Sequence, residues 1–303
     1  MSAFLACDWG TTNLRAWVIG EDGSVGPERG FDLGVSKLRP GEAAARFRDE
    51  VRPAMNAHSL PALMAGMIGS TLGWTVVPYE DCPVGIDDLS WRLFRVDEPG
   101  PPVRIVPGVK GRGLAGAPDV MRGEETQVFG WLAADPERAR GRKVVCHPGT
   151  HAKWILIEDG RIVRFVTAMT GELFSLLSKH SVLRTDGAGH DEAAFLKGLE
   201  AAGDGGALSA RLFTVRARVV AGNAPAASSA GYLSGLLIGS DAAALPGLLG
   251  IGTETPVELV GEPELCRLYD KALTWLGYRT AVHDGDEAVL AGLKALWRAG
   301  GGA

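Results

Sequence analysis

The stretch AFLACDWGTTNLRAWVIGEDG, residues 3–23, decides the fold. Apolar runs at 3–8 and 14–20 flank the turn Gly-Thr-Thr-Asn, which predicts a β-hairpin with Asp8 at the end of its first strand. The stretch VVCHPGTHAKWILIEDG, residues 144–160, has nearly the same form, but the distance from its turn glycine to its closing glycine is two positions shorter. Because strand side chains alternate with period two, both hairpins can keep the same face inward. The sequence therefore predicts a duplicated structural element.

The composition is that of an ordinary globular protein. The 303 residues suit about two domains, with 46% apolar and 22% charged residues. The net charge of −5 argues against nucleic-acid or anionic-membrane partners. No basic segment precedes an apolar run at the N-terminus, and the long apolar stretch at 228–252 is interrupted by Asp241 and Pro246. We therefore expect a cytoplasmic protein without a membrane partner.

Hydrophobic patterning outside the hairpins predicts alternating helices and strands. We expect a helix at 42–55, a buried strand at 60–70, and an irregular connection with one short strand at 97–118. The later predicted elements are a strand at 161–169, a strand at 256–260, and helices at 124–134, 171–183, 190–202, 229–244, 263–276 and 286–298. Mixed elements in two similar halves indicate an α/β protein of two domains.

The small residues at both hairpin turns indicate phosphate binding. Such a turn exposes several backbone N–H groups on one side, and threonine hydroxyls add further donors. Glycine is needed where a side chain would keep a phosphate away. Asp8 alone would repel phosphate, but it can hold Mg²⁺ through waters. We therefore expect one hairpin from each domain to face a shared cleft and to hold a nucleotide's phosphates from both sides.

Three other motifs are excluded by their context. Residues 111–116 match GxGxxG, but prolines on both sides prevent the strand and helix of an NAD site. His147 and His151 have the spacing of zinc ligands on a helix, but the Pro-Gly pair between them prevents a helix. Neither GxxxxGKS nor GxxxxGKT occurs, which excludes a P-loop kinase at the level of motifs.

Longer motifs then give a family resemblance. They are DWGTTNLRAW, AGMIGSTLGW with VPY after it, VMRGEETQVFG, PGTHAKW, MTGELFSLL with KHS after it, and YLSGLLIG. In this order the chain resembles the 2-dehydro-3-deoxygalactonokinase family, within the superfamily of sugar kinases, hexokinase, Hsp70-type chaperones and actin. Weaker similarity continues through LVGEPELCRLYDKAL and GDEAVLAGLKAL, so the resemblance covers nearly the whole chain.

The resemblance implies two ribonuclease-H-like domains of duplicated topology with an active-site cleft between them. Residues 1–120 would carry the first phosphate hairpin and the sugar-acid site, and residues 121–303 the second hairpin and the adenosine site. The implied activity is ATP-dependent phosphorylation of the 6-hydroxyl of 2-dehydro-3-deoxy-D-galactonate, with Mg²⁺, in galactonate catabolism.

The resemblance also assigns residues by position. Asp8 would hold the metal, and it precedes the first phosphate element, which is formed by Gly10, Thr11 and Thr12. The second element is formed by Gly149, Thr150 and His151, and the glycines expected at the adenosine are Gly235 and Gly261. At the last of these, Val-Gly-Glu stands where the superfamily has a glycine pair.

An acid between the two phosphate elements is expected to act as a base or as a water-mediated metal ligand. The candidates are Glu124 and Glu125, with Asp119 third, although two acids at a helix start also suit the helix dipole alone. The substrate's carboxylate and hydroxyls need donors, and the candidates are Asn13, Arg15, Ser70, Trp74, Arg122 and Lys153.

Several alternatives stay open at this point. One is a phosphatase of the same superfamily, and another is a kinase for the gluconate epimer or another sugar acid. A nucleotide-driven chaperone or filament subunit is a third. The segment GMIGSTLGW favours an organic acceptor over water, and no extra peptide-binding region is visible. We expect a small-molecule substrate and leave a homodimer open.

Overall fold

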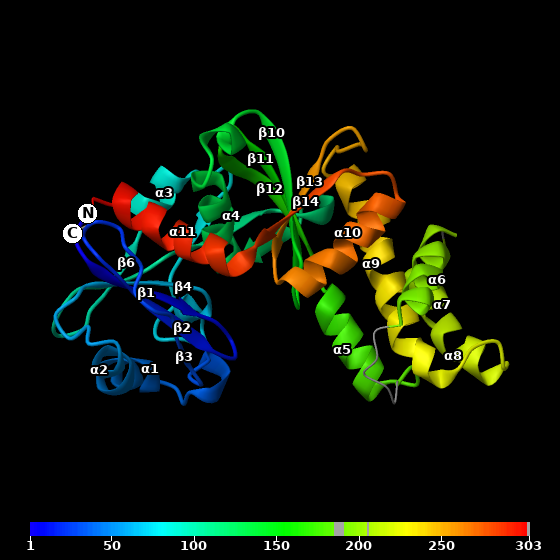
Figure 1. Ribbon diagram of the computed structural model, residues 1–303, viewed down its shortest axis with the longest axis horizontal. Helices are drawn as coiled ribbons and strands as arrows, with labels where there is room; N and C mark the ends of the chain where they lie inside the picture. The colour runs from blue at the N-terminus through cyan, green and yellow to red at the C-terminus, as the bar shows by residue number, and fades with distance from the viewer. Residues whose placement is uncertain (185–190, 205, 302–303) are drawn as a thin grey trace. The chain divides into compact units, whose positions relative to one another are not determined.

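The computed structural model describes residues 1–184, 191–204 and 206–301, and Figure 1 shows its mixed α/β fold. The chain divides into two compact units. The first contains Met1–Arg142, Ile157–Arg164 and Gly285–Ala303, and the second contains Lys143–Leu156 and Phe165–Asp284. The C-terminal segment therefore belongs to the first unit, and the units do not follow the division at residue 120 suggested by the sequence.

Close helix packing explains why the C-terminal segment joins the first unit. Helix α11 (Gly285–Ala299) lies against helix α4 (Glu124–Ala133). A Cβ atom built at Gly130 would lie 1.8 Å from the Ala288 carbonyl oxygen, and one at Gly292 would lie 1.9 Å from the Thr126 carbonyl oxygen. Only glycine allows the two backbones to approach so closely.

The main sheet of the first unit has the strand order β3-β2-β1-β4-β7-β6. The predicted hairpin is present, because β1 (Phe4–Trp9) pairs antiparallel with β2 (Leu14–Ile19). Strand β1 also pairs in parallel with β4 (Ala62–Ala65), which occupies the start of the stretch predicted as a buried strand. The other strands are β3 (Arg29–Phe31), β6 (Phe94–Val96) and β7 (Val103–Ile105).

The first unit also contains a smaller sheet, of which β8 (Gly108–Arg112) and the first residue of β9 (Pro118–Met121) fall in the stretch 97–118 that was predicted to be mostly irregular. Its order is β5-β8-β9, in which β5 is formed by Tyr79–Asp81. The prediction for 97–118 was therefore wrong in part, because that stretch holds β7, β8 and the start of β9. These strands are short and rich in glycine and proline, so they lack the apolar alternation by which strands are recognised.

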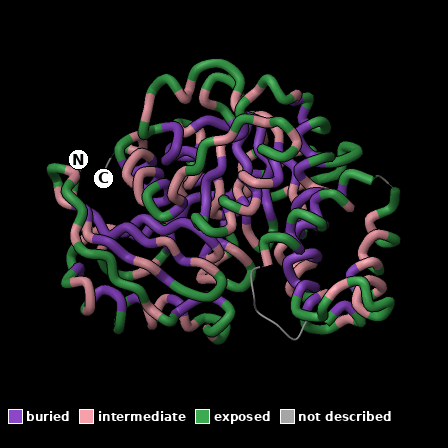
Figure 2. Tube along the Cα trace, turned by 45° about the vertical axis from the view of Figure 1, so that its right-hand side comes forward, coloured by how far each residue is buried: buried purple, intermediate pink, exposed green. Residues whose placement is uncertain are grey.

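Helices cover both faces of the main sheet. Residues 42–54 form α1 (Glu42–Arg46), a π-helical turn and α2 (Arg52–Ala54), as the helical spacing predicted. Phe47 of this segment packs in one core with Trp9, and on the other face Phe4 stacks on Trp297 of α11 with ring centroids 4.6 Å apart. Helix α3 (Ile86–Trp91) also packs against α11. All residues of β4 and five of the six in β1 are buried, and Figure 2 colours the trace by burial.

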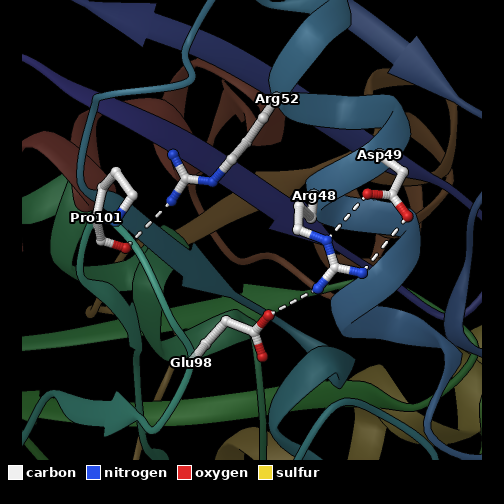
Figure 3. Close-up of polar contacts among 5 residues, drawn as sticks. All are labelled: Arg48, Asp49, Arg52, Glu98 and Pro101. Carbon is white, nitrogen blue, oxygen red and sulfur yellow. Dashed lines mark hydrogen bonds and ion pairs between the residues drawn. The ribbon is translucent and has the colours of Figure 1, made fainter.

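Arg52, a buried residue of α2, connects this helical segment to the loops that follow it and precede β7. The Arg52 guanidinium donates hydrogen bonds to the carbonyl oxygens of Ala57 (2.8 Å), Leu60 (2.6 Å) and Pro101 (3.3 Å). Its carbon also lies 4.8 Å from the Phe47 ring centroid. One turn earlier, Arg48 binds Asp49 and Glu98, as Figure 3 shows. These bonds hold the segment before β7 against the helix.

The second sheet has the order β12-β11-β10-β13-β14. The predicted second hairpin and third strand are present as β10 (Arg142–His147), β11 (Ala152–Glu158) and β12 (Arg161–Ala168). Strand β13 (Val257–Gly261) runs parallel to β10 and to β14 (Thr280–Asp284), which was not predicted. Apart from edge strand β6, both sheets place their strands in the same order: third, second, first, fourth, fifth.

Helices of the second unit pack around one apolar helix, α9 (Ser229–Leu248). A Cβ atom built at Gly235 would lie 2.0 Å from the Phe195 carbonyl oxygen of α6 (Glu192–Gly203). The prediction at 190–202 corresponds to α6, with residue 190 outside the described residues. The remaining helices are α5 (Thr170–His180), α7 (Leu208–Leu212), α8 (Thr214–Val220) and α10 (Pro263–Trp275), of which α7 and α8 were not predicted. Within the described ranges, no helix has the length and apolar character needed to cross a bilayer.

Candidate active site

The turn between β1 and β2 is held in place by hydrogen bonds from the segment at residues 34–36. The Gly10 carbonyl accepts a hydrogen bond from Val35 N–H, and the Thr11 carbonyl accepts bonds from the N–H and hydroxyl of Ser36. A Cβ atom built at Gly34 would lie 2.0 Å from the Thr12 carbonyl carbon, so this support requires glycine. Thr11 and Thr12 are exposed, and their hydroxyls have no partner among the residues the structure describes. The turn can therefore offer these donors to a ligand.

Asp8 lies just before this turn, at the end of β1. Arg15, its partner across the hairpin, donates from Nη2 to Asp8 Oδ2 at 2.8 Å. The Nη1 of Arg15 forms an ion pair with Asp286, in the first turn of α11. Arg15 was a candidate for substrate binding, and in the structure two carboxylates fix its guanidinium. Asp286 was missed, because its place depends on the return of α11 to the first unit.

The start of α4 lies beside the end of β1. A Cβ atom built at Gly66, just after β4, would lie 2.8 Å from the Trp9 carbonyl oxygen and 3.4 Å from Asp8 Oδ1. On its other side Gly66 meets Gly123, because a Cβ built at Gly123 would lie 3.3 Å from the Gly66 Cα. Gly123 has φ of 111°, a backbone conformation that L side chains rarely adopt. Two glycines thus bring the first residue of α4, Glu124, near Asp8.

The two adjacent acids of α4 have different environments. Glu124 is half-buried, and its Oε2 accepts a hydrogen bond from Arg122 N–H at 3.0 Å. Glu125 is fully buried, and its oxygens accept bonds from Gly123 N–H (2.7 Å) and the Thr126 hydroxyl (3.1 Å). Burial, reinforced by Glu124, raises the pKa of Glu125 to about 8. Near neutral pH, Glu125 is therefore mostly protonated. The third candidate acid, Asp119, lies in β9 opposite Gly111.

Arg122 is a buried cation with unused donors. Its Nη2 donates to the Val77 carbonyl at 2.6 Å, and its guanidinium lies 4.3 Å from the Tyr79 ring centroid. The Nε and Nη1 atoms are buried and have no hydrogen-bond partner in the described part of the chain. A Cβ atom built at Gly69 would lie 2.8 Å from Nη1, so Arg122 lies against the residue that precedes Ser70. Unpaired buried N–H groups of a cation are costly, which favours an anion or water here.

The other substrate candidates of the first unit have local structural contacts. The Ser70 hydroxyl donates to the Met67 carbonyl at 2.7 Å and accepts a bond from Leu72 N–H. Trp74 is half-buried, with its ring centroid 5.7 Å from that of Phe47. Asn13 is exposed in the turn, where its carbonyl accepts a bond from Gly10 N–H. Their contact with a substrate stays a prediction.

The turn between β10 and β11 is supported in a similar way. The Thr150 carbonyl accepts a hydrogen bond from the N–H of Glu172, in the first turn of α5. A Cβ atom built at Gly171 would lie 2.6 Å from the Gly149 carbonyl oxygen. Thr150 is exposed, and its hydroxyl has no partner within the described ranges. The Nε2 of His151 lies 2.5 Å from Glu172 Oε2, so the carboxylate orients the imidazole.

Asp241, a half-buried acid of α9, contacts the start of α5. The hydroxyl of Thr170, the first residue of α5, donates to Asp241 of α9. Burial raises the pKa of Asp241 to about 6, although the Thr170 bond opposes this shift. Sequence patterns gave no signal for this contact, because the two residues are far apart in the chain.

The two glycines expected at the adenosine lie in different places. Gly261 ends β13, and a Cβ atom built on it would lie 3.5 Å from the Pro148 carbonyl oxygen, directly before the second turn. Gly235 faces α6, so helix packing alone accounts for the glycine, and its contact with a nucleotide stays a prediction.

Lys153, the remaining candidate for substrate binding, is a buried residue of β11, and its contact with a substrate also stays a prediction.

The carboxylates near the first turn suit a metal ion that takes most of its ligands from phosphate and water. Among the described residues, no group of three or more His, Cys, Asp or Glu side chains could hold a metal ion. Mg²⁺ is commonly held by one or two carboxylates together with phosphate oxygens and waters. Asp8, which is partly exposed beside a turn with unused hydroxyls, fits that arrangement.

Comparisons with known proteins agree on one family. A model of the family described as 2-keto-3-deoxy-galactonokinase matches residues 8–296. A Rhizobium meliloti (strain 1021) protein named as a probable 2-dehydro-3-deoxygalactonokinase is 36% identical, covering 98% of this chain and 97% of its own. The 2-dehydro-3-deoxygalactonokinase of Escherichia coli (strain K12) is 35% identical, covering 97% of each chain. A crystal structure of a Sinorhizobium meliloti protein assigned by name to this enzyme has a TM-score of 0.87 at 36% identity, covering 98% of both chains.

Proposed function

Because the chain belongs to the 2-keto-3-deoxy-galactonokinase family, we propose that it transfers the γ-phosphate of ATP to the 6-hydroxyl of 2-dehydro-3-deoxy-D-galactonate. The observation that carries the proposal is the span of the family match, which begins at Asp8 and ends at residue 296. Both hairpin turns and the start of α4 lie inside it. The matching order of strands in the two sheets supports a pair of ribonuclease-H-like domains.

In this proposal the two turns hold the phosphates of one ATP. Thr11 and Thr12 donate hydrogen bonds from the first unit, and Thr150 donates from the second. Similar support of the two turns is consistent with a common task, because a fixed backbone keeps the donors in place as charge develops. Gly261, close to the second turn, suggests that adenosine binds to the second unit.

Mg²⁺ would be held by Asp8, whose Oδ2 is fixed by Arg15. When bound, the ion neutralises charge on the phosphates. Among the acids at the start of α4, we assign the base to Glu124. It is half-buried and begins the helix that the Gly66–Gly123 contact brings toward Asp8, whereas Glu125 is fully buried and mostly protonated near pH 7. The 6-hydroxyl oxygen attacks the γ-phosphorus, its proton moves to the Glu124 carboxylate, and the bond to the β–γ bridging oxygen breaks to release ADP.

The substrate's carboxylate is assigned to Arg122. Its Nε and Nη1 are the unused donors of a buried guanidinium, and a carboxylate oxygen can accept a charge-assisted hydrogen bond from Nη1, which lies beside Gly69. Because both atoms are covered, the segment at 69–77 has to move for the substrate to reach them. This assignment places the sugar-acid site in the first unit.

The proposal is tested by measuring ADP release with ATP, Mg²⁺ and each of two keto-deoxy acids, the galactonate and gluconate epimers. We expect ADP release that depends on the galactonate epimer, and a 6-phosphate product identified by mass spectrometry. Release of inorganic phosphate without a phosphorylated sugar acid would instead indicate a phosphatase. Preference for the gluconate epimer would correct the substrate while leaving the kinase assignment in place.

A further inference from the structure

The second turn is supported by a network of contacts that the reaction itself does not require. The Gly149 carbonyl contacts the backbone at Gly171, and the Thr150 carbonyl accepts the N–H bond of Glu172. Both supporting residues belong to the first turn of α5. The position of the turn therefore depends on where α5 begins.

The start of α5 is fixed in turn by α9. Thr170 is only 6% exposed, and its hydroxyl donates to the carboxylate of Asp241. Stability alone does not account for an acid at this position. A carboxylate largely withdrawn from water loses hydration, and apolar residues of similar size are commonly as stable or more stable there. The raised pKa of Asp241 reflects the same loss of hydration.

We propose that Asp241 is a positioning residue for the second turn. Through Thr170 it fixes the first turn of α5, which holds Thr150 and orients His151 through Glu172. The inference rests on the proposed function in one respect, namely that the second turn binds the phosphates of ATP. Asp241 itself touches neither the turn nor the nucleotide in this scheme, and so it acts only through Thr170.

The charge on Asp241 makes the network sensitive to pH. The titratable groups that face Asp241 are Cys146 of β10 and Tyr269 of α10, and burial raises the pKa of each well above its ordinary value. Both therefore stay neutral where Asp241 titrates. Above about pH 6 Asp241 is charged and accepts strongly from Thr170, and below that pH it becomes neutral and the bond weakens.

The first test separates KM for ATP from KM for the sugar acid. We expect Thr170→Val and Asp241→Ala each to raise KM for ATP by about tenfold, the loss of one hydrogen bond to a charged group. KM for the sugar acid should stay unchanged. Thr170→Ser keeps the hydroxyl and should retain the wild-type KM. The matched control is Ser240→Ala, because among the described residues the Ser240 hydroxyl donates to the Leu236 carbonyl of its own helix and to no other group.

The second test uses pH and direct binding. In the wild type, the dissociation constant for ATP should rise as pH falls below about 6, whereas Asp241→Asn should lack this dependence. Binding measured by calorimetry needs no turnover, so the inference can be tested even if the sugar acid is not the substrate. The inference is overturned if Thr170→Val and Asp241→Ala bind ATP as the wild type does. It is also overturned if both variants raise KM for the two substrates equally.

Discussion

The turns of the two units differ less in their backbone than in the side chains around them. In each, a carbonyl of the turn is tied to a neighbouring segment, and a glycine of that segment lies against the turn: Gly34 in the first unit and Gly171 in the second. Two positions before the turn glycine, however, the first hairpin has Asp8 and the second has His147. The shared feature is a rigid set of donors, and the difference is a carboxylate.

This difference suggests a division of roles. Carboxylates gather near the first turn, where α4 begins beside Asp8 and where α11 contributes Asp286. The second turn is adjoined instead by the His151–Glu172 pair and by Gly261. We therefore expect changes near the first turn to reduce kcat, and changes at the second turn to act mainly on ATP binding.

The largest effect is expected at Asp8. Asp8→Asn removes the negative charge proposed to hold Mg²⁺, so kcat should fall by roughly 10³-fold in the ADP-release assay. The matched change is His147→Asn at the equivalent position of the second hairpin, which should leave kcat far closer to that of the wild type. Equal losses in the two variants would remove the proposed distinction between the turns.

A smaller loss of kcat is expected at Glu124. Glu124→Gln keeps the shape and an acceptor oxygen but cannot take the hydroxyl proton, so kcat should fall by about 10²-fold with little change in KM. The dependence of kcat on pH should also lose its acidic limb. A wild-type kcat in this variant would show that Glu124 is not the base and that another acid has this role.

Substitution of the threonines in the two turns should weaken ATP binding, which is a smaller effect than the losses of kcat above. Thr12→Ala and Thr150→Ala each remove one donor to a phosphate, so each should raise KM for ATP by about tenfold. If only one of them does so, the two turns do not serve the same nucleotide. Thr12→Ser and Thr150→Ser, which keep the hydroxyl, are the controls.

The sequence predicted the parts of the molecule that depend on local pattern. Both hairpins and most long helices were found, because apolar periodicity and Gly-Thr turns are local signals. The prediction failed at β8 and α8, whose segments are short and weakly patterned. The contacts of Gly66 with Gly123, of Arg15 with Asp286 and of Thr170 with Asp241 were also missed. Each joins residues far apart in the chain, and no spacing in the sequence records such a meeting.

The smallest effect on activity is expected at Glu125, where the change appears in stability instead. Its pKa is about 8 in the folded protein, above the ordinary value of 4.5. Between these values the folded state binds a proton that the unfolded state has released, so the folding stability contributed by this group falls as pH rises. Below about pH 4.5 and above about pH 8 the contribution no longer changes.

Glu125→Gln imitates the protonated acid and removes this dependence. Relative to the wild type, the variant's free energy of unfolding should increase from about pH 5 to pH 8, by roughly 4 kcal/mol or less. Urea unfolding at three pH values measures it, and kcat near pH 7 should stay close to the wild-type value because Glu125 is already mostly neutral there. A stability difference that does not vary with pH would show that Glu125 is ionised in the folded protein. Glu125 would then add a further negative charge to those of Asp8, Glu124 and Asp286 near the first turn, and the contrast with the second turn would become sharper.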